Sequence, residues 1–351
     1  MSSVRRNSIG RVHWLMLVVL TGVAVVILFF VVKGKPLPTP VLIGQANSEP
    51  LSIHCIEGTW YWREQPLKGK GRLVRATTAG IKEFASAEAL TAFDTDGSTL
   101  VWTARDGITW SVMSANSDGS GGHSVWSGKE EPMGVKLTQG RIYWLRRTPA
   151  ALDISLPFPP LQSSLQVVSL PTGGGTLDMG ATLAESDTGR VLGIYEGVLY
   201  VAALRMSRPG STVVYRVEAQ GKTPKRIAST ERHLPALLTR EGDLYWLAPS
   251  METNSPQPAM HLFHRDKAGV IEPLSDWLPM GGTLYETSHG IMYADKEYPP
   301  NFWSAGSQAD FPTALPLPKD FNAIAAGDKT ALVAPASSSR AKPMLYQIPL
   351  P

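Results

Sequence analysis

A glycine turn followed by an apolar, aromatic strand recurs along almost the whole chain, and this repeat restricts the fold most strongly. It is clearest at Glu241-Gly-Asp-Leu-Tyr-Trp-Leu247. The copies align on one position, occupied by Tyr61, Val101, Tyr143, Tyr200, Tyr245, Tyr293 and Leu332. They are 40, 42, 57, 45, 48 and 39 residues apart, close to the roughly 40–50 residues of a four-stranded propeller blade. The repeat therefore predicts an all-β, seven-bladed β-propeller over residues 41–351.

The C-terminal repeat has only three strand-like runs, around 322–325, 330–333 and 344–348. A blade with an unpaired edge strand is a liability, and propellers avoid it by closing the ring. The short apolar run Val41-Leu-Ile43 lies just ahead of the first repeat. We expect Val41–Gly44 to supply the fourth strand of the last blade.

Residues 14–32 carry no charge. A helix of this length can cross about 30 Å of hydrocarbon. We predict a cytoplasmic tail over 1–12, a transmembrane helix over 13–32 and a proline-rich spacer over 33–40. Arg5, Arg6 and Arg11 precede the apolar run and Lys33 and Lys35 follow it, which favours a cytoplasmic N-terminus. The expected location is a bacterial-type inner membrane with the propeller in the periplasm. A cleaved signal peptide is the alternative, but its apolar core is usually shorter.

The composition excludes several classes of function. A formal net charge of +3 is too small for the basic surface of a nucleic-acid-binding protein. The single cysteine, Cys55, allows neither an intrachain disulfide nor a thiolate zinc cluster. We expect no cofactor and no metal ion.

Candidate catalytic and metal-binding motifs are weak. Asp94-Thr-Asp-Gly-Ser98 resembles the start of a calcium loop, but Arg105 stands where a carboxylate is needed, so the stretch is predicted to be a plain turn. His261 and His264 are three residues apart, and on a strand such side chains point to opposite faces. No histidine lies near a carboxylate in a recognisable motif, although the axis of a propeller brings together residues that are distant in sequence. We assign no catalytic residue.

Insertions between the second and third strands of several repeats give the best candidate for a binding surface. The longest spans residues 146–161 and carries Ile154, Leu156, Phe158 and Leu161. A shorter one, over 296–303, carries Tyr298, Phe302 and Trp303. Equivalent loops emerge on one face of a propeller, and an apolar loop held by prolines is suited to docking. These seven residues are predicted to contact other membrane or periplasmic protein subunits.

Trp110-Ser-Val-Met-Ser-Ala-Asn-Ser-Asp-Gly-Ser120 and Val101-Trp-Thr-Ala104 resemble the strand-and-turn sequences of YWTD-type and TolB-like propellers. The resemblance extends over roughly residues 41–351 and implies the propeller fold. Such propellers most often act as binding platforms, and fold alone does not decide function.

Two functions follow from these patterns. The first is a membrane-anchored, non-catalytic scaffold, an accessory or assembly subunit of an envelope or membrane complex such as a respiratory or photosynthetic one. The second is a ligand-binding sensor, or a hydrolase or lyase, with its site at the mouth of the central channel. Clustered carboxylates and histidines at the axis would favour the second function.

Overall fold

A computed structural model describes most of the chain from residue 39 onward. The described residues are 39–148, 163–184, 186–205, 211–218, 223–230, 237–249, 259–274, 278–279, 283–287, 290–294, 301–305, 313–318, 320–337 and 342–350. The chain divides into two units, residues 1–38 and 39–351, and the predicted transmembrane segment 13–32 lies outside the described residues. Within them, no helix is long and apolar enough to cross a membrane.

The described residues form strands and no helix, which confirms the all-β class. The strands make seven sheets, six of four strands and one of five. We number these sheets as blades in chain order. Blade 1 holds β2 (Leu51–Ile56), β3 (Thr59–Glu64), β4 (Gly71–Thr77) and β5 (Gly80–Ala87), and blade 2 holds β6 (Ala89–Thr95), β7 (Thr99–Asp106), β8 (Thr109–Asn116) and β9 (His123–Gly128). Blade 3 holds β10 (Met133–Thr138), β11 (Arg141–Thr148), β12 (Ser164–Pro171) and β13 (Asp178–Leu183), and blade 4 holds β14 (Thr188–Tyr195), β15 (Val198–Arg205), β16 (Ser211–Glu218) and β17 (Lys225–Thr230).

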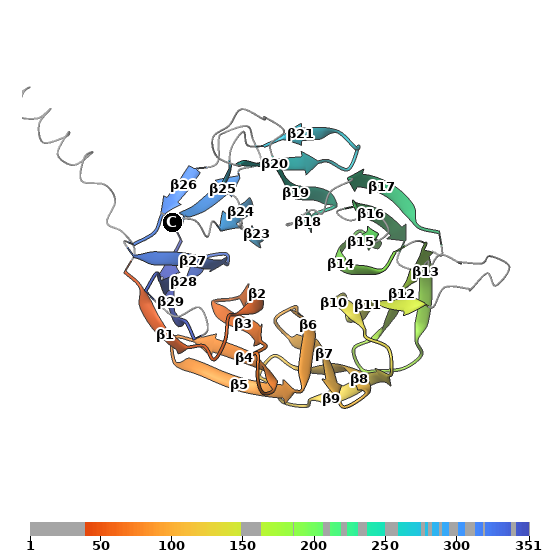
Figure 1. The fold of residues 1–351 in the computed structure, drawn as a ribbon, viewed down its shortest axis with the longest axis horizontal. Helices are drawn as coiled ribbons and strands as arrows, with labels where there is room; N and C mark the ends of the chain where they lie inside the picture. The colour runs from red at the N-terminus through yellow and green to blue at the C-terminus, as the bar shows by residue number, and fades with distance from the viewer. Residues whose placement is uncertain are drawn as a thin grey trace, which may run out of the picture. The chain divides into compact units, whose positions relative to one another are not determined.

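The remaining three blades complete the ring (Figure 1). Blade 5 holds β18 (Leu237–Arg240), β19 (Asp243–Pro249), β20 (Ala259–Arg265) and β21 (Ile271–Pro273), with the short β22 (Leu278–Pro279) as a fifth strand beside β20. Blade 6 holds β23 (Thr283–Thr287), β24 (Gly290–Ala294), β25 (Asn301–Ala305) and β26 (Thr313–Pro316), and blade 7 holds β27 (Phe321–Ala326), β28 (Thr330–Pro335), β29 (Met344–Pro349) and β1 (Val41–Gln45). The sheets stand radially, with the first strand of each blade innermost.

The two ends of the propeller meet in blade 7. Strand β1 pairs antiparallel with β29, with Val41 opposite Gln347 and Gln45 opposite Met344. The fourth strand of the last blade therefore comes from the N-terminal side, as predicted. Ile43 on β1 is 4% exposed and packs with Trp60 and Trp62 of blade 1 and Leu345 of blade 7, so apolar packing as well as backbone pairing closes the ring.

Four blades join their first and second strands by the same two-residue turn. The turns are Glu57-Gly58, Gln139-Gly140, Glu196-Gly197 and Glu241-Gly242, and both residues of each have positive φ, between 48° and 90°. Two such residues make a type I′ turn, whose twist matches that of the flanking strands, and glycine adopts this conformation without strain. The glycine of the repeat thus sets the hairpin that the aromatic strand follows.

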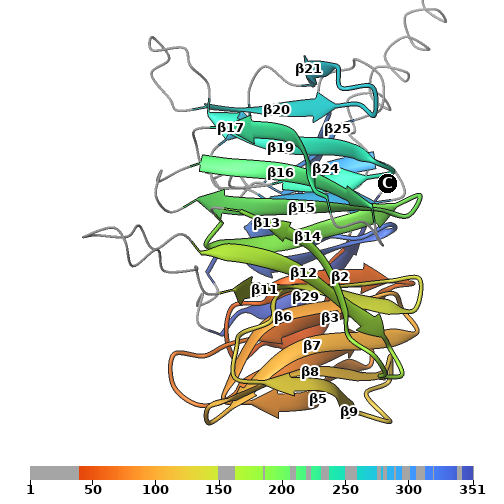
Figure 2. The same ribbon diagram turned by 90° about the vertical axis from the view of Figure 1, so that its right-hand side faces the viewer.

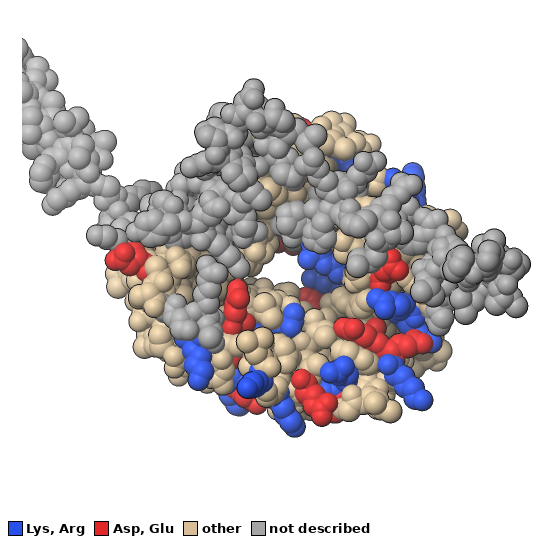
Figure 3. All heavy atoms as spheres, in the orientation of Figure 1, with Lys and Arg blue, Asp and Glu red and all other residues tan. Residues whose placement is uncertain are grey.

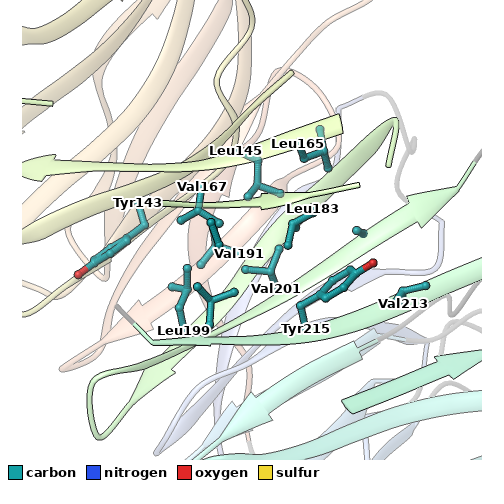
Figure 4. Close-up of a cluster of buried hydrophobic side chains, with 13 residues drawn as sticks. Tyr143, Leu145, Leu165, Val167, Leu183, Val191, Leu199, Val201, Val213 and Tyr215 are labelled. Carbon is teal, nitrogen blue, oxygen red and sulfur yellow. The ribbon is translucent and has the colours of Figure 1, made fainter. Parts of the chain in front are cut away.

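The aromatic and aliphatic side chains of the second strands pack between neighbouring sheets. Figure 4 shows one such layer, in which Tyr143 and Leu145 of β11 meet Val191 of β14 and Val201 of β15. Tyr143 and Trp144 are 5% and 1% exposed, and Tyr245 and Trp246 are half-buried against other clusters. The prediction that these aromatics build the core is confirmed.

The antiparallel order of strands divides the loops between two sides of the ring, which Figure 2 shows edge-on. One side, the turn side, carries the turns between first and second strands and between third and fourth strands. The other, the insertion side, carries the connections between second and third strands and between consecutive blades. Val41, at the start of β1, lies on the turn side, because Gln45 at its other end is followed by the link into blade 1.

Candidate functional site

A cavity of about 1140 Å³ occupies the centre of the ring. Figure 3 shows the central opening with acidic and basic side chains near its edge. Its walls are the innermost strands β2, β6, β10, β14, β18, β23 and β27, together with neighbouring turn residues. Because each blade contributes the same strand, residues more than 200 positions apart in sequence line one space.

The innermost strands are irregular where they face the cavity. A shift in register against the second strand interrupts β2, β6, β10, β14 and β27. An extra residue of this kind bends a strand and changes the direction of its side chains, and such bulges are common beside functional sites. In blades 1, 2 and 3, the first paired residues after the shift are His54, Phe93 and Lys136.

A row of three titratable side chains crosses blades 1, 2 and 3 at equivalent positions. His54, Asp94 and Lys136 lie opposite Tyr61, Val101 and Tyr143 of their second strands. Asp94 is in the middle: its Oδ1 is 3.6 Å from His54 Nε2 and 3.2 Å from Lys136 Nζ. Its Oδ2 accepts a hydrogen bond from the backbone N–H of Leu137 at 2.7 Å. The Asp94 side chain is 3% exposed, and its partners come from blades 1 and 3.

His54 is neutral at neutral pH in this setting. Burial lowers the pKa of the imidazole, and the positive charge of Lys136 lowers it further, while Asp94 and the backbone of Phe93 act in the opposite direction without reversing the shift. The ring also packs edge-on against Phe93, with centroids 5.4 Å apart. A neutral imidazole next to a carboxylate is suited to accept a proton from a substrate or from water.

Further charged residues line the cavity in the other blades. Arg190 comes from β14, and desolvation lowers the pKa of its guanidinium because protein surrounds it within the channel. Arg240 of β18 lies 3.7 Å from Glu286 of β23. Desolvation raises the pKa of Glu286, an effect that Arg240 and Lys136 reduce and that Glu241 and Asp328 increase. The pKa values of His54 and Glu286 are thus shifted in opposite directions within one cavity.

The two sequence motifs considered as possible metal sites, at 94–98 and at His261 and His264, are described next. Asp96 caps its own turn, because its Oδ1 accepts hydrogen bonds from the backbone N–H groups of Ser98 and Thr99 at 3.0 and 2.8 Å. Residues 96–98 therefore form the predicted turn between β6 and β7, whereas Asp94 and Thr95 belong to strand β6. His264 Nε2 and Nδ1 each lie 3.0 Å from a carboxylate, of Asp243 and Glu272. In the part of the chain that the structure describes, no group of three histidines, cysteines or carboxylates is placed to hold a metal ion.

The residues predicted to bind a partner remain predictions. Ile154, Leu156, Phe158, Leu161 and Tyr298 lie outside the described residues. Phe302 and Trp303 belong to strand β25, so the insertion that was assigned to 296–303 ends in a strand of blade 6.

Local sequence motifs do not reveal the row of His54, Asp94 and Lys136, because its members are about 40 residues apart. A signal was nevertheless present in the repeat. Each of the three stands seven positions before the aligned residue of its copy, Tyr61, Val101 or Tyr143 (61 − 54, 101 − 94 and 143 − 136). Aligning the polar residues as well as the aromatic ones would have placed them together.

No protein-family model and no curated protein sequence matches this chain. Solved structures do share the fold. The chain is similar to an acylaminoacyl peptidase of Pyrococcus horikoshii (TM-score 0.59, 9% identity, covering 86% of this chain and 51% of that chain). It is also similar to a puromycin-hydrolyzing peptidase of Mycobacterium tuberculosis (0.56, 11%, 86% and 52%) and to the β-propeller domain of the Trilobed protease of Pyrococcus furiosus (0.55, 8%, 86% and 96%).

These similarities confirm the β-propeller fold. The chain covers about half of the first two of these peptidase chains, 51% and 52%. The third structure is described as having an open velcro topology, whereas here β1 closes blade 7. The expectation of a non-catalytic scaffold is corrected by this comparison, because the similar propellers belong to peptidases. The alternative, a hydrolase or ligand-binding function at the central channel, is the better supported one.

Proposed function

We propose that the protein is a hydrolase whose substrate binds in the central cavity and whose general base is His54. The observation that carries the proposal is the row of His54, Asp94 and Lys136 at equivalent positions of three adjacent blades. Asp94 is fixed by its contacts with Leu137 and Lys136, and its negative charge lies 3.6 Å from the imidazole Nε2 of His54. The likeness of the fold to the propellers of peptidases supports the same class of reaction.

The proposed reaction uses a water molecule as the nucleophile. The neutral imidazole of His54 accepts a proton from water while the water oxygen attacks an acyl carbon, and the electron pair of the C=O bond moves to its oxygen. Positive charge from Lys136 and Arg190, which line the same cavity, stabilises the oxyanion. The C–X bond then breaks as the carbonyl re-forms, and the leaving group takes the proton from the imidazolium.

The test is hydrolysis by the purified protein of chromogenic carboxylic esters and aminoacyl 4-nitroanilides. His54→Gln should lower kcat/KM by 100-fold or more, the usual range for loss of a general base. His123→Gln, in the exposed β9, is the matched control and should leave the rate unchanged. In the unmodified protein kcat/KM should rise with pH through a pKa below 6.5, since His54 must be unprotonated. Equal rates for the protein and His54→Gln on every substrate would refute the proposal.

A second candidate is a ligand-binding sensor without turnover. It is supported by the cavity itself, whose lining brings charged side chains from several blades around one space and suits a bound ligand whether or not a reaction follows. In that case the cavity binds its ligand and His54→Gln changes affinity without any change in reaction products. Product analysis by mass spectrometry after long incubation separates the two candidates.

We also propose that residues 13–32 anchor the propeller in an inner membrane, with the propeller in the periplasm and the insertion side available to other protein subunits. The uncharged run over 14–32 supports the anchor. Fractionation tests it: the full chain should remain in the membrane pellet after carbonate extraction, and a chain starting at residue 39 should be soluble. Release of the full chain by carbonate would contradict the anchor.

A further inference from the structure

Within the described part of the chain, the innermost strand of each blade has one edge that no other strand covers. The strands β2, β6, β10, β14, β18, β23 and β27 each stand at one end of the strand order of their sheet. All seven contribute residues to the lining of the central cavity, so their uncovered edges lie beside it. Such an edge is a template for pairing with another extended chain, and proteins commonly interrupt it with a bulge.

Bulges interrupt five of these seven edges. The strands β2, β6, β10, β14 and β27 each shift register against the second strand of their blade, whereas β18 and β23 pair without a shift. Only Arg240 of β18 lines the cavity, followed by Glu241 of the next turn, but all five residues of β23 line it. Among the described inner strands, β23 alone presents an unbroken edge to the cavity along its whole length.

The register of β23 shows which of its backbone groups point to the cavity. Thr287 lies opposite Gly290, and two residues separate them along the chain. A hairpin with a two-residue connection closes on a hydrogen-bonded pair, and such pairs alternate along an antiparallel ladder. The hydrogen bonds to β24 therefore use every second residue back from Thr287. The N–H and C=O groups of Leu284 and Glu286 point the other way, toward the cavity.

Side-chain contacts hold β23 to the blades on either side of it. Tyr285 Oη donates a hydrogen bond to the carbonyl oxygen of Ile324 in blade 7 at 2.7 Å. Toward blade 5, Glu286 Oε1 lies 3.7 Å from Arg240 Nε. Leu284 is 8% exposed and packs in the apolar cluster between blades 5 and 6. A strand that is already fixed in place loses little conformational entropy when it binds.

The cavity has room for the backbone of one more strand beside β23. A strand of five residues is about 17 Å long, and paired strands lie about 4.8 Å apart. Spread over that length of ~17 Å, the cavity volume of about 1140 Å³ gives a mean width of roughly 8 Å. The width exceeds the spacing of paired strands, so an extended chain on the edge of β23 stays inside the cavity.

We infer that β23 binds an extended peptide segment as an additional strand, through the backbone N–H and C=O groups of Leu284 and Glu286. These two residues are about 6.7 Å apart along the strand, which is the spacing of alternate residues in an extended peptide. Main-chain hydrogen bonds then supply the affinity. The inference rests on the proposed function for the location of the site, and it adds the class of substrate, because a peptide on this edge shares the cavity with His54.

The experiment is calorimetric titration of the full chain with a neutral pentapeptide of alternating threonine and valine, acetylated at one end and amidated at the other. Five analogues each carry one N-methyl group, which removes an N–H donor without changing the charge. Methylation at alternate residues should weaken binding about tenfold, the loss of one hydrogen bond with its desolvation cost. Methylation at the residues between them should leave the affinity unchanged. Equal affinities for all five analogues, or no binding of the parent peptide, would overturn the inference.

Two variants at one position test the edge from the side of the protein. Glu286→Pro removes an N–H that does not bond to β24, a change that an edge strand tolerates, and should weaken binding of the parent peptide about tenfold. Glu286→Ala removes the same carboxylate but keeps the N–H, and should bind the peptide like the unmodified protein. An equal loss in both variants would assign the effect to the side chain and contradict pairing through the backbone.

Hydrogen exchange gives a second measurement if Glu286→Pro folds poorly. In the unmodified protein, the amides of Leu284 and Glu286 should become protected when the peptide binds. The amide of Tyr285 is used by β24 and should change little. Unchanged exchange at Leu284 and Glu286 in the presence of bound peptide would exclude strand addition at β23.

The proposed hydrolase activity can fail independently of this result. His54→Gln leaves β23 unchanged and should show the same alternation among the five analogues while losing turnover. Alternation without turnover in any variant would reject the hydrolase and leave the peptide site standing. Turnover without alternation would do the opposite.

Discussion

The backbone N–H of Asn47 donates a hydrogen bond to Oε2 of Glu64 at 3.0 Å. Glu64 is fully buried, and it also accepts hydrogen bonds from Trp62 Nε1 at 2.8 Å and from Arg72 Nε at 2.6 Å. Asn47 follows the closing strand β1, whereas the other three residues belong to blade 1. One buried carboxylate therefore attaches the closing segment to the first blade.

Replacing Glu64 by alanine should lower the free energy of unfolding by about 3–5 kcal/mol, because Arg72 is then left as a largely buried charge without this partner. Glu83→Gln is the control: its carboxylate also contacts Arg72, at 3.7 Å, but is 46% exposed. That change should have an effect within about 0.5 kcal/mol. Urea denaturation measures both, and similar losses for the two variants would contradict the buried role of Glu64.

Ring closure should depend on one side of β1. Ile43→Ala removes a side chain that is 4% exposed and packs against blade 1, and it should cost about 2–4 kcal/mol. Leu42→Ala, on the same strand but 49% exposed, should cost well under 1 kcal/mol. Thermal unfolding followed by circular dichroism compares them. If both variants melt like the unmodified protein, packing of β1 does not hold the ring closed.

Gly134→Ala and Gly140→Ala separate backbone strain from steric overlap. Both glycines have left-handed φ, +60° and +68°, which costs a non-glycine residue about 1 kcal/mol. A Cβ at position 140 meets nothing within 4 Å, whereas at 134 it overlaps Arg190. Gly134→Ala should therefore be less stable than Gly140→Ala by about 1–3 kcal/mol.

His264 should make the stability of blade 5 sensitive to pH. Burial lowers the pKa of its imidazole, but hydrogen bonds with Asp243 and Glu272 outweigh burial, so the net shift is upward from 6.5. A raised pKa in the folded state stabilises the protein below pH 6.5, and this contribution is lost as pH rises through the folded-state pKa. The melting temperature of His264→Gln should therefore differ most from that of the unmodified protein near pH 5.5. A constant difference from pH 5 to 9 would exclude this linkage.

The repeat predicted much of the fold, and the reason is local. An X-Gly turn such as Glu241-Gly242 requires positive φ, and the following Tyr-Trp pair has to be buried, so each copy specifies a hairpin with one apolar surface. The closing strand at Val41–Gly44 was also predictable, because the last repeat lacked one strand. The short fifth strand β22 was not, since a two-residue strand has no periodicity to detect.

The all-β class and the aromatic core could be predicted from the sequence, because both follow from turn chemistry and apolar patterning within one repeat of about 45 residues. The closing strand was predicted from the strand that the last repeat lacks. The repeat marks His54, Asp94 and Lys136 as equivalent positions, but their contacts, of His54 with Asp94 and of Asp94 with Lys136, are established by the folded structure. Those relationships depend on strand register, on bulges and on the angle between blades. The repeat register predicts that such residues lie on neighbouring blades, but it does not give the distance between their side chains.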